Sequence, residues 1–206
     1  MKKILPGIII IIIVALAAAA LIIFRGPDLT PYMHLTMPAI SQKADQTMLV
    51  VEMSGNPDTQ AGKAIKLLYG TYFSLRGVTK DFSKLIPRAR WNADDQASPE
   101  LWKGYFALPV PDTLTTLPII EPQANMTVSI QKWEYGTVAE ILHAGPYENE
   151  QPTIDKLQYY ITQNGYKIIG SHEEEYLKGP GMLGKGNPKK YLTIIRYRIA
   201  LINPGK

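Results

Sequence analysis

The chain has 206 residues, of which 46% are hydrophobic and 19% charged, a composition typical of a folded protein rather than a disordered one. The absence of cysteine excludes disulfides, thiolate zinc sites and cysteine nucleophiles. We expect no nucleic-acid partner despite the formal charge of +4, because three of the 22 basic residues lie in the first 25 positions and the other 19 nearly balance 18 acidic residues.

Residues 1–25 are predicted to form a transmembrane anchor. The 21 residues Ile4 to Phe24 carry no charge, and as a helix they extend roughly 31 Å, about the thickness of a bilayer's hydrocarbon core. A cleaved signal peptide is the alternative, with Lys2-Lys3 before the apolar run and Ala17 to Ala20 as small residues for cleavage, but such runs are usually ~7–15 residues long. The positive charge before the segment predicts a single-pass membrane protein with a cytoplasmic N-terminus and an extracytoplasmic C-terminal domain, periplasmic where there are two membranes.

Residues 26–46 contain three prolines and no clear hydrophobic period, which predicts a juxtamembrane tether with one short strand or helix at most. Residues 47–206 are predicted to form one domain. Its two halves, about 47–122 and 123–206, share one pattern.

The first half begins with a strand at Met48–Met53 and a turn at 54–57. A helix is expected to follow, with Asp58 as its N-cap. Its apolar stripe, at a spacing of three and four, is Ala61, Ile65, Leu68, Tyr72 and Leu75. Two more strands are predicted at 88–91 and 101–110.

The second half repeats this order after a proline-rich connection and a strand at 126–135. A strand at Thr137–His143 ends at Ala144-Gly145-Pro146-Tyr147, and a helix starts near 148–152 and stops at Asn164-Gly165. The stripe of this helix lies 89 positions after its counterpart in the first half and comprises Ile154, Leu157 and Ile161. Strands are predicted at 168–177 and 190–201.

These elements predict an α+β fold made of a duplicated strand–helix–strand–strand unit with pseudo-twofold symmetry, preceded by one transmembrane helix. A half of this size buries too little apolar surface to be stable alone. We therefore expect the halves to pair and to leave a central groove at their seam, and such seams are common ligand sites.

The second half resembles the GyrI-like small-molecule-binding domain, the effector-binding domain of many bacterial transcription activators. The resemblance rests on the strand ending in His143-Ala144-Gly145-Pro146-Tyr147 and on Glu174-Glu175-Tyr176-Leu177-Lys178-Gly179-Pro180. It implies a duplicated fold whose groove binds amphipathic, often cationic, aromatic compounds, with a groove carboxylate at Glu174 and Tyr176 two residues later. Some similar members hydrolyse strained cyclopropane-bearing toxins. Unlike the regulators, this chain has no helix-turn-helix DNA-binding region and carries the predicted anchor.

The densest polar run is His172-Glu173-Glu174-Glu175-Tyr176. On a strand, His172, Glu174 and Tyr176 share one face, and the other two glutamates share the opposite one, which we expect to be solvated. A carboxylate at Glu174 in an aromatic groove would attract an organic cation by charge while the rings supply cation–π attraction. The residues expected to bind the ligand are Glu174, Tyr176, Tyr147, Trp91 and Tyr105.

No metal site, cofactor or catalytic residue is predicted. His34, His143 and His172 lack metal-ligand spacing, and His143 is expected to be a strand-end residue with a satisfied ring. No Gly-x-Ser-x-Gly motif marks a serine nucleophile. The glycine-rich segment 179–186 has Gly186 where a phosphate-binding loop needs Ser or Thr, so we expect a flexible hairpin loop.

The sequence thus favours a membrane-tethered protein that binds an amphipathic, cationic or aromatic small molecule between its two halves. Whether the protein is an enzyme stays open. The first alternative is a hydrolase acting on a reactive small molecule in the same groove, which a second acid near Glu174, such as Glu140, would favour. The second alternative is a protein-interaction module without a ligand.

Overall fold

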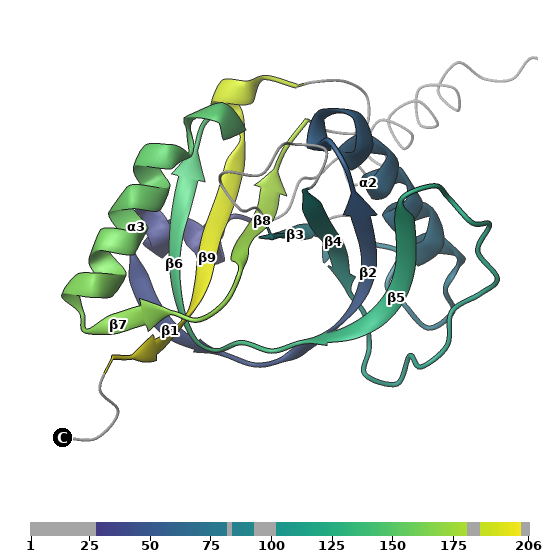
Figure 1. Cartoon of the computed structure of the whole chain (residues 1–206), viewed down its shortest axis with the longest axis horizontal. Helices are drawn as coiled ribbons and strands as arrows, with labels where there is room; N and C mark the ends of the chain where they lie inside the picture. The colour runs from purple at the N-terminus through teal and green to yellow at the C-terminus, as the bar shows by residue number, and fades with distance from the viewer. Residues whose placement is uncertain (1–27, 82–83, 93–101, 181–185, 203–206) are drawn as a thin grey trace, which may run out of the picture.

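The computed structural model describes residues 28–81, 84–92, 102–180 and 186–202, which form a curved antiparallel sheet with a helix at each end (Figure 1). The predicted anchor lies outside these residues. In the part of the chain that is described, no helix is long and apolar enough to cross a membrane. The strands are β1 Ala39–Lys43, β2 Gln46–Ser54, β3 Arg88–Asn92, β4 Lys103–Pro109, β5 Met126–Trp133, β6 Gly136–Ala144, β7 Tyr166–Ile168, β8 His172–Lys178 and β9 Leu192–Leu201. The α-helices are α2 Pro57–Ser74 and α3 Gln151–Gln163, and the 3-10 helices are η1 Thr30–Thr36, η4 Tyr147–Asn149 and η5 Pro188–Lys190.

The strand order is symmetric about the centre of the sheet, because corresponding strands of the two halves lie equally far from the β3–β8 pair. It runs β1-β6-β9-β8-β3-β4-β2-β5, with β7 added beside β9. Outward from the β3–β8 seam, each half contributes the second, third and first strand of its strand–helix–strand–strand unit, so β2-α2-β3-β4 corresponds to β6-α3-β8-β9. This arrangement confirms the predicted α+β class and follows the predicted strand order.

One cross-strand row shows where the halves meet. The register places Val51 opposite Phe106, Phe106 opposite Ala89, Ala89 opposite Glu174, Glu174 opposite Ile195 and Ile195 opposite Ile141. Directly paired residues project to the same side of a sheet. Because Phe106 packs with the α2 core and Ile195 with the α3 core, both helices cover this face, which we call the helix face. Glu174 is the one charged member of the row, at its centre.

Each helix buries the stripe that its sequence predicted. Leu68 and Tyr72 of α2 are buried against β2 and β4, and Leu157 and Ile161 of α3 are buried against β6 and β9. The predicted start of α2 is wrong by two positions. Asn56 is the N-cap, its Oδ1 accepting a hydrogen bond from the Asp58 backbone N–H at 2.9 Å, and this leaves Pro57 at the first helical position, which suits its fixed φ.

The stretch predicted as a tether contributes structure to the domain. Leu35 of η1 is buried with Leu177 and Ile194, and β1 pairs with β6 from Ala39 opposite Glu140 to Lys43 opposite Gly136. These contacts place η1 and β1 in the same half as β8 and β9. η1 packs on the side of the sheet opposite the helices, and β1 extends the sheet at its β6 edge.

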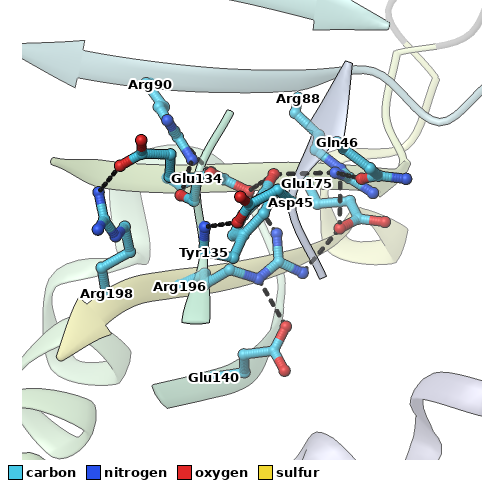
Figure 2. A network of polar contacts seen from close by, with 11 residues as sticks. Asp45, Gln46, Arg88, Arg90, Glu134, Tyr135, Glu140, Glu175, Arg196 and Arg198 are labelled. Carbon is cyan, nitrogen blue, oxygen red and sulfur yellow. Dashed lines mark hydrogen bonds and ion pairs between the residues drawn. The ribbon is translucent and has the colours of Figure 1, made fainter. Parts of the chain in front are cut away.

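That opposite side carries a buried ionic network, and we call it the arginine face (Figure 2). Arg196, 2% exposed, donates to Glu140 at 2.6 Å, to Glu175 at 2.8 Å and to Glu173. Two further ion pairs cross the β3–β8 seam, Arg90 Nε to Glu173 Oε2 at 2.7 Å and Arg88 Nε to Glu175 Oε2 at 3.1 Å. Burial alone would lower the pKa of Arg196, and the three carboxylates raise it above its ordinary value.

The expectation of a solvated face for Glu173 and Glu175 is wrong, since the two residues are 2% and 3% exposed. Alternation along the strand assigned them to the correct side of the sheet. This side is covered as well, because η1 packs on it and Tyr135 donates its hydroxyl to Glu173 Oε1 at 3.0 Å. A strand pattern shows which residues share a face and leaves open what lies over that face.

Candidate functional site

The candidate site lies on the helix face at the centre of the sheet, where β8 presents three polar side chains. His172 Nε2 lies 2.9 Å from Glu174 Oε1, and His172 Nδ1 lies 2.8 Å from the Tyr197 hydroxyl of β9. The side chains of His172 and Glu174 are 19% and 12% exposed. The imidazole is therefore fixed from both ring nitrogens, and the carboxylate is largely removed from solvent.

Glu150 joins this pair from the start of α3. The chain leaves β6 through Gly145, whose φ of +145° suits glycine, and then forms η4. The Glu150 carbonyl accepts the first hydrogen bonds of α3, from Thr153 at 2.8 Å and Ile154 at 3.0 Å. Its side chain does not cap the helix. One carboxylate oxygen instead lies in a cluster with His172 and Glu174 in which the three ligand atoms are within 4.8 Å of one another.

Glu150 is only 6% exposed, and its Oε1 has no hydrogen-bond partner among the described residues. Burial, and then the negative charge of Glu174, raise the pKa of Glu150 to about 8. Removing an ionised carboxylate from water without a partner is costly. A pKa of about 8 means that Glu150 is mostly protonated near pH 7 in the free protein, and a cation bound beside it would favour the ionised form.

Aromatic rings border these carboxylates. The Tyr147 ring lies 5.6 Å from that of Tyr176 and 5.2 Å from that of Tyr191, measured between centroids. Burial and the nearby Glu174 charge raise the pKa of both Tyr147 and Tyr176. Trp91 is paired in register with His172, and its ring packs edge-on against Phe106 at 5.4 Å. Tyr147 is 36% exposed, so it forms the solvent side of this aromatic group.

The structure brings together four of the five residues that were predicted to bind the ligand. Glu174, Tyr176, Tyr147 and Trp91 lie on the helix face. Tyr105 does not join them. Its neighbour Phe106 faces α2, so alternation along the strand places Tyr105 on the arginine face. There Tyr105 is paired with Arg90 and packs on a buried cluster that includes Met48.

Two further residues stand differently from expectation. Glu140, which was considered as a second acid, lies on the arginine face and binds Arg196. Glu150 occupies the position of a second acid instead, and no local pattern distinguishes it from the exposed Glu148. The satisfied ring of His143 is confirmed, with Nδ1 3.0 Å from the Thr153 hydroxyl and Nε2 3.2 Å from the Pro146 carbonyl oxygen.

The two faces of the seam differ in charge compensation. On the arginine face, Glu173 and Glu175 each contact two guanidinium groups. Within the described part of the chain, Glu150 and Glu174 form no ion pair with a lysine or arginine, and His172 is the one basic group beside them. A cation, whether organic or metallic, is the ligand that this arrangement favours.

Two cavities lie away from Glu174. One, of about 460 Å³, lies between α2 and the segment 118–123. The other, of about 250 Å³, lies on the arginine face beside Arg90, Tyr135 and Arg198. Beside Glu174, the Tyr147 ring packs against the rings of Tyr176 and Tyr191. The predicted central groove therefore stays a prediction.

No protein-family model and no curated protein matches the chain. Among solved structures, a hydrolase from Listeria innocua is 21% identical, with a TM-score of 0.65 over 83% of this chain and 95% of its own. An uncharacterized conserved protein from Listeria innocua is 20% identical, with a TM-score of 0.66 over 85% of this chain and 100% of its own. The C-terminal domain of EcmrR is 12% identical, with a TM-score of 0.57 over 81% of this chain and 98% of its own. These likenesses show a shared fold, and they support the GyrI-like fold that the sequence resemblance implied.

Proposed function

We propose that this chain is a membrane-tethered small-molecule-binding protein whose C-terminal domain holds an amphipathic, aromatic cation against Glu174. The observation that carries the proposal is the pair of buried carboxylates, Glu150 and Glu174, next to tyrosine rings and without a lysine or arginine partner in the described residues. An organic cation supplies the missing positive charge, and its rings stack on the aromatic group.

The expected energetics agree with this assignment. A buried charge that faces a ligand cation contributes about 1–3 kcal/mol at effective protein dielectrics, or about 5- to 150-fold in affinity. The cost of holding the two carboxylates close together in the free protein is relieved when the cation binds. Tyr147 is the ring best placed to move aside for a ligand, because it is the partly exposed one.

The membrane tether rests on the sequence of residues 4–24 and on the charge that precedes it. With the N-terminus in the cytoplasm, the binding domain lies outside the cytoplasmic membrane. The protein would then capture its ligand on the extracytoplasmic side.

A hydrolase is the second candidate, and one observation favours it. A second acid near Glu174 would favour chemistry at this site, and Glu150 lies close enough to be that acid. Two adjacent carboxyl groups readily divide into a proton donor and a base, because like charges at close range do not both ionise easily. A hydrolase from Listeria innocua also shares the fold.

Ligand titration separates these alternatives. The purified full chain in detergent is titrated calorimetrically with a trimethylammonium-naphthalene and with tert-butylnaphthalene, which share a shape and differ in charge. We expect the cation to bind about 5- to 150-fold more tightly, and E174Q to remove most of that preference. Equal affinities for the two compounds would overturn the cation assignment. Binding of neither compound would favour the interaction module, and product formation on incubation with reactive electrophiles would identify the hydrolase.

A further inference from the structure

We propose that Glu150, His172 and Glu174 form a binding site for a divalent first-row transition-metal ion. The site uses one ligand atom from each residue. It goes beyond the proposed function because it assigns a second kind of cation to this cluster, and a metal ion would compete with the organic cation for Glu174.

The distances suit one coordination sphere. First-row metals bind nitrogen and oxygen ligands at about 2.0–2.2 Å, so two ligands of one ion lie roughly 3–4.4 Å apart. His172 Nε2 and Glu174 Oε1 are already 2.9 Å apart, and all three ligand atoms lie within 4.8 Å of one another. His172 and Glu174 are also two positions apart on β8, which directs both side chains to one face. Small side-chain rotations suffice to close the site around an ion.

Glu150 supplies an independent indication of a ligand. Its side chain is more than nine-tenths buried, and its Oε1 has no hydrogen-bond partner in the described part of the chain. Buried polar atoms in native structures are nearly always paired, and an exception calls for an explanation such as an ion. Its backbone is fixed at the first turn of α3 by two hydrogen bonds, so the carboxylate is held towards His172 and Glu174.

The surroundings of His172 are those of a metal ligand. Metal-binding histidines typically hydrogen-bond through the ring nitrogen that does not face the metal, which fixes the orientation of the ring. Here Nδ1 lies 2.8 Å from the hydroxyl of Tyr197, whose side chain is itself buried on β9. When Nδ1–H donates to that hydroxyl, Nε2 presents its lone pair to the two carboxylates. A mixed imidazole and carboxylate set favours zinc, cobalt, manganese or iron over magnesium or calcium.

The acidic residues of the arginine face provide a contrast. Glu173 and Glu175 are equally buried, but each contacts two guanidinium groups. Their charge is compensated within the protein, so a metal ion gains nothing there. The helix-face cluster differs in having two carboxylates and one imidazole with no arginine or lysine paired to them among the described residues.

The test uses the tag-free full chain in detergent, titrated calorimetrically with Zn²⁺, and with Co²⁺ whose visible spectrum reports its coordination. We expect one ion per chain, a Co²⁺ spectrum typical of four or five ligands, and no comparable binding of Mg²⁺. E150Q and E174Q should each lower the affinity for Zn²⁺. Loss of an outer-shell partner typically costs about 10- to 100-fold, so loss of a direct ligand should cost at least as much. Tyr197→Phe should lower the affinity for Zn²⁺ about 10-fold, since it removes the outer hydrogen bond to His172 and leaves the three ligand residues in place.

Two matched controls exclude surface binding. His34→Gln removes an exposed histidine, and Glu148→Gln removes an exposed acid two residues before Glu150; both should leave Zn²⁺ affinity unchanged. Absence of stoichiometric Zn²⁺ binding, or binding that survives E150Q and E174Q, overturns the proposal. Both variants are expected to fold, because glutamine keeps the size of glutamate and neither carboxyl group is paired with an arginine or lysine among the described residues. Titration of the same preparations with the naphthalene cation keeps the proposed function and the metal site separately testable.

Discussion

Glu173 and Glu174 are adjacent on β8, but their carboxylates lie on opposite faces of the sheet in opposite electrostatic surroundings. Glu173 accepts from Arg90, Arg196 and Tyr135 and is 2% exposed. Glu174 has His172 as its basic neighbour and lies close to a second carboxylate, Glu150. One peptide unit therefore separates a residue that stabilises the fold from a residue that is available to a ligand.

This contrast predicts different effects of the same substitution. Glu173→Gln leaves the buried Arg196 and the partly exposed Arg90 short of a carboxylate, and breaking a buried pair such as Arg196–Glu173 costs about 3–5 kcal/mol. Glu174→Gln removes a carboxylate from beside Glu150 and should leave the free energy of unfolding unchanged or higher. Urea unfolding of both variants, followed by circular dichroism, measures the difference. Equal losses of stability in the two variants would contradict the assignment of the two faces.

The arginine face also predicts acid sensitivity. Burial tends to raise the pKa of Glu175, but Arg88 and Arg196 outweigh it and hold that pKa below its ordinary value of 4.5. A carboxyl group with a lowered folded-state pKa contributes stability above its unfolded pKa, and this contribution is lost as the pH falls through the folded-state value. We therefore expect the free energy of unfolding to fall as the pH is lowered below about 4.5.

Glu150 acts in the opposite sense, since a pKa raised to about 8 makes stability decline as the pH rises from about 4.5 towards 8. The acid series is therefore best measured in the E150Q background by urea unfolding between pH 7 and pH 3. Because the Glu175 pairs are buried, added salt should change the acid slope little. A urea midpoint that stays constant down to pH 3 would show that these ion pairs contribute no pH-dependent stability.

The position of the Trp91 ring predicts that residue 104 must be glycine. A Cβ at Gly104 would lie 2.8 Å from Cζ3 of the Trp91 ring, so Gly104→Ala should displace the indole and cost about 1–3 kcal/mol, the usual range for overpacking. The tryptophan emission should shift at the same time. Gly62→Ala is the matched control, because its Cβ meets nothing within 4 Å on α2 and should stabilise by about 0.4–1 kcal/mol. Retention of wild-type emission and stability in G104A would contradict the Trp91 packing.

The orientation in the membrane is tested with reporters fused after Lys206. A periplasm-active reporter should give signal, and the full-length fusion should be found in the membrane fraction, because the positive charge precedes the apolar segment. Signal from a cytoplasm-active reporter alone would reverse the orientation. A shortened, soluble product would instead identify the N-terminal segment as a cleaved signal peptide.

Local patterns in the sequence predicted most of the strands and both α-helices. Periodicity placed Leu68 and Leu157 on buried helix faces, and alternation assigned Glu174 and Tyr176 to a common face. Both signals depend on residues a few positions apart along the chain. Such patterns can therefore be recognised in the sequence without knowledge of the tertiary contacts.

Features that depend on distant segments were not predictable in this way. The burial of Glu173 results from Tyr135, 38 positions away, and from Arg196, 23 positions away. Glu150 joins the site because η4 delays the start of α3 to Gln151. The wrong face for Tyr105 arose because no sequence signal identified which side of its strand meets α2.

The two ion pairs at the seam, Arg88 with Glu175 and Arg90 with Glu173, are related by the symmetry of the strand order and have their charges exchanged between the halves. Pairing two copies of β3 would therefore set arginine against arginine, and pairing two copies of β8 would set glutamate against glutamate, each inside a dry interface. Each half accordingly pairs with the other half in preference to a second copy of itself. If expressed as separate polypeptides, they should assemble as a heterodimer and resist forming either homodimer.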